Sequence, residues 1–68
     1  MDNKKTMEIS GTLLYPVTVG MAAFISEESG MRRTSTVLNV QKLSQAEIQF
    51  ETRNTFYHLH LTQSGVMA

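Results

Sequence analysis

Residues 46–61 read AEIQFETRNTFYHLHL. On both sides of Arg53-Asn54, apolar and polar side chains alternate with a period of two, the pattern of half-buried β-strands. A turn placed at Arg53-Asn54 sets Thr52 opposite Thr55. Apolar residues then face one another in three further pairs: Phe50 with Tyr57, Ile48 with Leu59, and Ala46 with Leu61. Because a slip by one residue would oppose apolar to polar side chains, we predict a β-hairpin in this register.

The length and composition leave room for one marginal domain. A chain of 68 residues buries only about 60% of the surface that it exposes when unfolded. It contains no cysteine, which excludes disulfides and thiolate metal sites and is typical of a reducing cytoplasm, where we expect the protein. The stability of the domain must therefore come from close packing or from a second subunit.

Upstream of the hairpin, residues from Met7 to Tyr15 alternate as a strand would, and Pro16 ends the pattern. Residues 17–26 are compatible with two structures. Pro16 suits the first position of a helix, and Met21, Phe24 and Ile25 have helical spacing. Three β-branched residues followed by Gly20 argue against a helix, so we favour a strand.

Residues 27–30 are expected to form a turn, in which Gly30 supplies a positive φ. A Thr- and Val-rich strand follows over residues 31–41, and residues 42–45 connect it to the hairpin. We therefore predict an all-β fold, a small five-stranded antiparallel meander that forms a curled sheet or a small barrel. The single β domain is expected over residues 7–62, between a disordered N-terminus (1–6) and a flexible C-terminus (63–68).

Two short motifs carry a resemblance. Arg33-Thr34-Ser35 followed by Val37, and then Thr52-Arg53-Asn54-Thr55 with Tyr57 and Leu59, resemble a pattern in small uncharacterised bacterial and phage-borne β proteins. Those proteins are similar to SH3-like barrels and have no assigned activity. The resemblance covers residues 30–61; it implies a barrel and no catalytic residue.

The outward face of the hairpin holds the candidate interaction face, which consists of Phe56, His58, His60 and Glu47. In the predicted register Glu47 faces His60, and two imidazoles beside a carboxylate are also ligands that zinc accepts. A solvated polar face explains the same pattern, so we predict no metal or cofactor and keep metal-dependent activity at His58 and His60 as an alternative. Phe56 would be exposed there unless a loop or the N-terminal segment covers it.

The basic residues suggest an alternative function, which is binding of nucleic acid. After the N-terminus they are Arg32, Arg33, Lys42 and Arg53, and with Phe56 or Tyr57 they would suit a nucleic-acid-binding small β-barrel. Six acidic residues balance the six basic ones, whereas nucleic-acid binders usually carry a basic excess. Nucleic acid is therefore the less favoured partner.

No motif indicates an enzyme, because the glycines form no phosphate-binding loop and the sole aspartate is Asp2. No segment has the length of a membrane span. We therefore predict a small protein-interaction or regulatory module that binds an unidentified protein and also associates with itself. The edge of a strand near residues 33–40 is the expected site of self-association.

Overall fold

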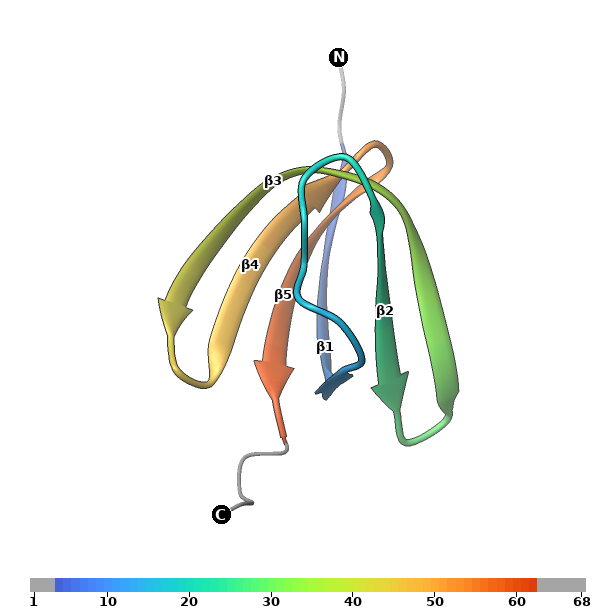
Figure 1. The fold of residues 1–68 in the computed structure, drawn as a ribbon, viewed down its shortest axis with the longest axis vertical. Coiled ribbons are helices and arrows are strands. Elements are labelled where there is room, and N and C mark those ends of the chain that lie inside the picture. Colours follow the sequence, from blue (N-terminus) through green and yellow to red (C-terminus); the bar gives the residue numbers. More distant parts are fainter. Residues whose placement is uncertain (1–3, 63–68) are drawn as a thin grey trace.

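The structure is a computed structural model that describes residues 4–62. Five strands follow one another around a closed barrel (Figure 1). They are β1 (Lys5–Leu13), β2 (Ala22–Glu27), β3 (Gly30–Ser44), β4 (Glu47–Thr52) and β5 (Thr55–Leu61). The prediction of a small, five-stranded all-β domain is confirmed, and the sheet closes.

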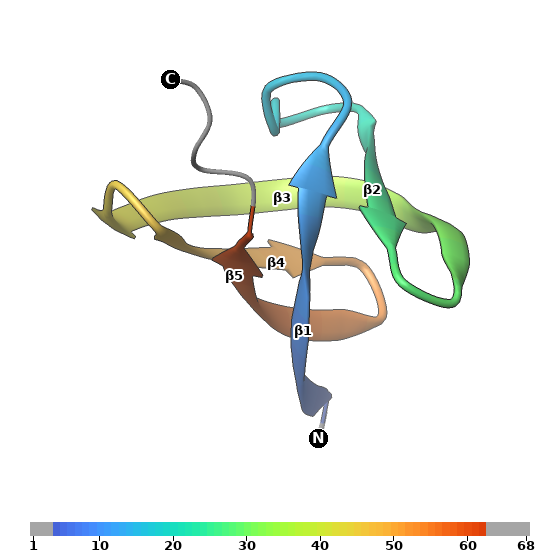
Figure 2. The same ribbon diagram turned by 90° about the horizontal axis from the view of Figure 1, so that it is seen from below.

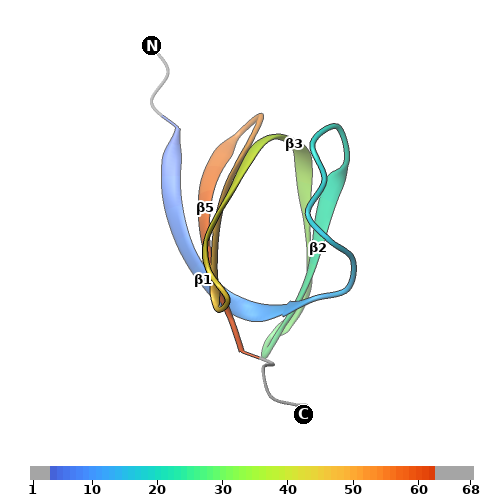
Figure 3. The same ribbon diagram turned by 60° about the vertical axis from the view of Figure 1, so that its left-hand side comes forward.

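The barrel closes through a parallel pair. Each strand is antiparallel to the next, while β1 runs parallel to β5 from Lys5 opposite Thr55 to Gly11 opposite Leu61. In a meander of five alternating strands the first and the last point the same way, so closure requires one parallel pair. Figure 3 shows β1 and β5 side by side along one wall.

The hairpin of β4 and β5 has the predicted register. Phe50 lies opposite Tyr57 and Ile48 opposite Leu59. The Phe50 and Tyr57 rings are stacked with their centroids 5.0 Å apart. Both rings are buried, together with Leu59, in a core that is completed by Ile9, Ala23, Ile25 and Val37. The alternation in residues 46–61 therefore builds about half of the core.

Strand β3 is long and strongly bent. Its first half pairs with β2 and its second half with β4, so that it runs the length of the molecule (Figure 2). The register shifts at three places along β3, and such bulges bend a strand. At the first bulge the hydroxyl of Thr34 accepts a hydrogen bond from the Ala23 amide at 2.9 Å, which satisfies that buried donor. The bulges also leave Leu38 and Leu43 half-exposed.

Several boundaries differ from the expectation. Strand β3 continues to Ser44, although residues 42–45 were expected to be a connection. Residues 17–26 were expected to be a strand throughout, but β2 begins at Ala22 and residues 14–21 form a loop with turns. A turn that includes Gly20, whose φ is +96°, immediately precedes β2. Lys5 and Thr6 belong to β1 rather than to a disordered N-terminus. The expected flexible C-terminus, residues 63–68, lies outside the described residues.

Strands β1 and β2 approach one another very closely at Gly11. A Cβ atom added there would come within 2.5 Å of the Ser26 carbonyl oxygen, so only glycine fits. In the neighbouring hairpin, Gly30 has the positive φ that its turn position requires, as predicted. None of the residues from 4 to 62 forms a helix of the kind that spans a membrane.

Candidate functional site

The predicted interaction face is assembled on the outside of the barrel. Along β5, Phe56, His58 and His60 point away from the core, because they alternate with the buried Tyr57 and Leu59. Residues paired across antiparallel strands share a face. Their β4 partners are Glu51 for Phe56, Gln49 for His58 and Glu47 for His60. All four residues of the predicted face therefore lie on one surface.

A further carboxylate reaches this surface from the other side of β5. The parallel pairing of β1 with β5 places Glu8 opposite His58 and Ser10 opposite His60. Glu8 is the member of this cluster that the sequence did not identify. Its position on the polar face of an alternating strand was visible, but nothing in the sequence stated which strand would lie beside β1.

The two imidazoles lie between the two carboxylates. Their ring centroids are 4.5 Å apart. Glu8 lies 3.7 Å from Nδ1 of His58 and 3.5 Å from Nε2 of His60. Glu47 lies 3.7 Å from Nε2 of His58 and 3.6 Å from Nδ1 of His60. Each ring therefore turns one nitrogen toward each carboxylate, an arrangement that suits ion pairing of protonated imidazoles or binding of a cation by neutral ones.

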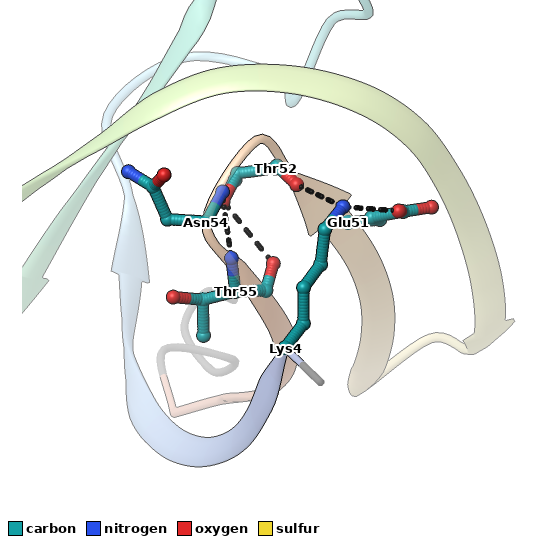
Figure 4. A network of polar contacts seen from close by, with 5 residues as sticks. All are labelled: Lys4, Glu51, Thr52, Asn54 and Thr55. Carbon is teal, nitrogen blue, oxygen red and sulfur yellow. Dashed lines mark hydrogen bonds and ion pairs between the residues drawn. The ribbon is translucent and has the colours of Figure 1, made fainter. Parts of the chain in front are cut away.

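Phe56, at the other end of this surface, is partly covered by the N-terminal segment. The ammonium of Lys4 lies 5.3 Å from the Phe56 ring centroid, within the range of a cation–π contact. Lys4 also forms an ion pair with Glu51 and donates a hydrogen bond of 2.9 Å to the Thr52 carbonyl (Figure 4). Lys4 thus holds the start of the described chain against the β4–β5 turn, while Phe56 stays 39% exposed.

Beside Phe56 lies a shallow pocket that extends across three strands. It is lined by residues of β3, β4 and β5: Asn39, Val40, Gln41, Gln49, Phe50, Glu51 and Phe56. The pocket borders the second half of β3, where residues 38–44 have a strand partner on one side only, namely β4, within the described part of the chain. We call this one-sided stretch the β3 edge. It carries the half-exposed Leu38, Val40 and Leu43.

The basic residues of the alternative nucleic-acid site are dispersed. Arg32 and Arg33 lie near the start of β3 and Lys42 near its end, about 30 Å further along the strand at ~3.3 Å per residue. Arg53 lies in the β4–β5 turn, and its amide donates to the Thr36 carbonyl in the middle of β3. The fold therefore does not bring the four cations into one patch.

Arg32 is in addition engaged within the molecule. Its guanidinium forms an ion pair with Glu27 across the β2–β3 hairpin. The hydrogen bond that Arg32 donates to the Glu27 carboxylate is the main cause that raises the pKa of Arg32 above its ordinary value. The charge is thus already compensated, which lowers its value as a phosphate ligand.

Comparison with models of known protein families, with curated proteins and with solved structures gives no match for this chain.

Proposed function

We infer that the chain is a small protein-interaction module that associates with a second copy of itself through the β3 edge. The observation that carries this proposal is the single-sided pairing of residues 38–44, whose backbone groups on the outer side have no strand partner within residues 4–62. Such an edge is a template for pairing with another strand, and the exposed Leu38, Val40 and Leu43 would add apolar burial.

The size of the core supports a second subunit. The described residues bury seven apolar side chains, which is a small core for a chain without disulfides. A formal net charge of zero imposes no overall repulsion between two copies. The absence of cysteine also agrees with a protein of the reducing cytoplasm.

The β3 edge contains its own constraint on register. Lys42 lies within it, and an antiparallel pair that set Lys42 of one copy opposite Lys42 of the other would place like charges face to face. Registers that offset the two lysines avoid this repulsion.

The pocket lined in part by Phe56 borders the β3 edge. A second protein bound at the β3 edge would therefore also contact the residues that line this pocket.

Light scattering coupled to size-exclusion chromatography tests this proposal. At tens of micromolar the wild type should elute as a dimer, and Leu38→Lys and Leu43→Lys should shift it to a monomer because added lysines repel across the pair. Met31→Lys is the matched control, since Met31 is 57% exposed in the half of β3 that β2 already pairs. A wild type that stays monomeric at every concentration contradicts the proposal, and so does equal loss of the dimer in the control.

A further inference from the structure

The contacts among Glu8, Glu47, His58 and His60 are too long for ordinary hydrogen bonds. The four nitrogen–oxygen distances run from 3.5 to 3.7 Å, whereas a charge-assisted hydrogen bond usually measures about 2.7–2.9 Å. The two imidazoles and the two carboxylates therefore lie side by side without forming hydrogen bonds. Direct hydrogen bonding does not explain why these four groups are gathered at this spacing.

The spacing corresponds to ligands that share a metal ion. Zinc binds imidazole nitrogen and carboxylate oxygen at about 2.0–2.1 Å in tetrahedral geometry, so two ligand atoms of one ion stand about 3.3–3.4 Å apart. Oε2 of Glu8 lies 3.7 Å from Nδ1 of His58, and Oε1 of Glu8 lies 3.5 Å from Nε2 of His60; each contact is within a few tenths of an ångström of that separation. Imidazole ligands suit zinc rather than magnesium or calcium.

Glu8 is the carboxylate that would share the ion with the imidazoles. In the described part of the chain, one group of side chains places three ligand atoms within 4.8 Å of one another, and its members are Glu8, His58 and His60. Glu8 is also 69% exposed, so an ion can enter from solvent on that side. Nδ1 of His58 and Nε2 of His60 are the nitrogens that face it.

Glu47 faces the two imidazole nitrogens that would not bind the ion, Nε2 of His58 and Nδ1 of His60. With Nδ1 of His58 and Nε2 of His60 on the ion, the remaining ring N–H groups point to the two oxygens of Glu47, at 3.7 and 3.6 Å. Nε2 of His58 is buried and has no hydrogen-bond partner among residues 4–62. A carboxylate behind a metal-binding imidazole usually accepts this proton and fixes the ring, so zinc binding would give the orphaned nitrogen a role.

We propose that Glu8, His58 and His60 bind one Zn²⁺ ion, with water in the fourth position and Glu47 orienting both imidazoles. This site is separate from the β3 edge and does not depend on self-association. It joins β1 to β5, so an ion bound there would tie the two strands that close the barrel.

Isothermal titration calorimetry of the untagged full-length protein with zinc chloride tests the proposal. The wild type should bind one ion per chain, and Glu8→Gln, His58→Ala and His60→Ala should each weaken binding at least about tenfold. Glu47→Gln should weaken it about 10- to 100-fold, as losses of carboxylates behind metal ligands do. Glu28→Gln is the control, because this exposed carboxylate lies in the β2–β3 turn and should change nothing.

An NMR titration of the wild type tests the same site without variants, and so remains informative if a variant fails to fold. Zinc should shift the NMR signals of the His58 and His60 imidazoles and leave those of the Tyr15 ring in place. Absence of heat and of these shifts overturns the proposal. Binding that survives in Glu8→Gln but is lost in Glu47→Gln overturns the assignment of Glu8 as the ligand.

Discussion

Glu8 of β1 lies directly opposite His58 of β5, with its carboxylate 3.7 Å from the imidazole Nδ1. The two residues are far apart in the sequence and meet only because the meander closes with a parallel pair. The same closure places β5 between two carboxylate-bearing strands, with Glu47 on the other side. The geometry of the barrel thus creates the one polar cluster on its outer face for which we propose a ligand.

Gly11→Ala should lower the free energy of unfolding by about 1–3 kcal/mol, as overpacking of a close contact does. The added methyl group would collide with the Ser26 carbonyl and with the Ile25 side chain, both of which are fixed in β2. Urea denaturation followed by circular dichroism measures the change. Ser10→Ala is the control, since Ser10 is exposed in the same strand; equal stability of Gly11→Ala and the wild type would contradict the close approach of β1 and β2.

Thr52→Val should destabilise the β4–β5 turn, although it preserves the volume of the side chain. The buried Thr52 hydroxyl accepts hydrogen bonds from the amides of Asn54 and Thr55 and donates to the Thr55 carbonyl (Figure 4). Leaving such groups without a partner costs about 1–3 kcal/mol. Thermal or urea unfolding measures this loss.

The matched control for Thr52 is Thr6→Val, which changes an exposed threonine of β1. Surface substitutions of that kind usually stay within about 0.5 kcal/mol. If both variants lose the same stability, the hydroxyl of Thr52 does not hold the turn.

Oligonucleotides should bind weakly and with little dependence on salt. Arg33 and Lys42 lie toward opposite ends of β3, Arg53 lies in the β4–β5 turn, and Arg32 is paired with Glu27. Fluorescence polarisation with labelled single- and double-stranded oligonucleotides, at low and at physiological salt, measures the affinity. Tight binding that falls steeply as salt rises would instead indicate several phosphate contacts and favour a nucleic-acid-binding barrel.

The sequence predicted those elements whose pattern is local. In residues 46–61 the alternation and the turn specify one register, and the structure has the predicted pairs of Phe50 with Tyr57 and Ile48 with Leu59. Glu47 is found beside His60 for the same reason. The glycine in the β2–β3 turn was equally predictable, because the need for a positive φ is a property of a single residue.

Features that depend on distant contacts were not predictable. Val17, Val19 and Met21 suit a strand, yet they lie in the loop that joins β1 to β2, which begins at Ala22. The bulges of β3 place Leu38 outside the core, although an unbroken alternation would have set it on the same face as the buried Thr34. Glu8 was missed because the partner of β1 is decided by closure of the whole barrel.

NMR detection of contacts between β1 and β5 tests the closure of the barrel most directly. In isotope-labelled protein, nuclear Overhauser effects should connect Met7 to Tyr57, Glu8 to His58 and Ile9 to Leu59, in rising order along both strands. That order establishes the parallel pair which closes the barrel and places Glu8 beside the imidazoles. Contacts that run in opposite order, or a β5 that contacts β4 alone, would contradict the closed barrel and the metal site together.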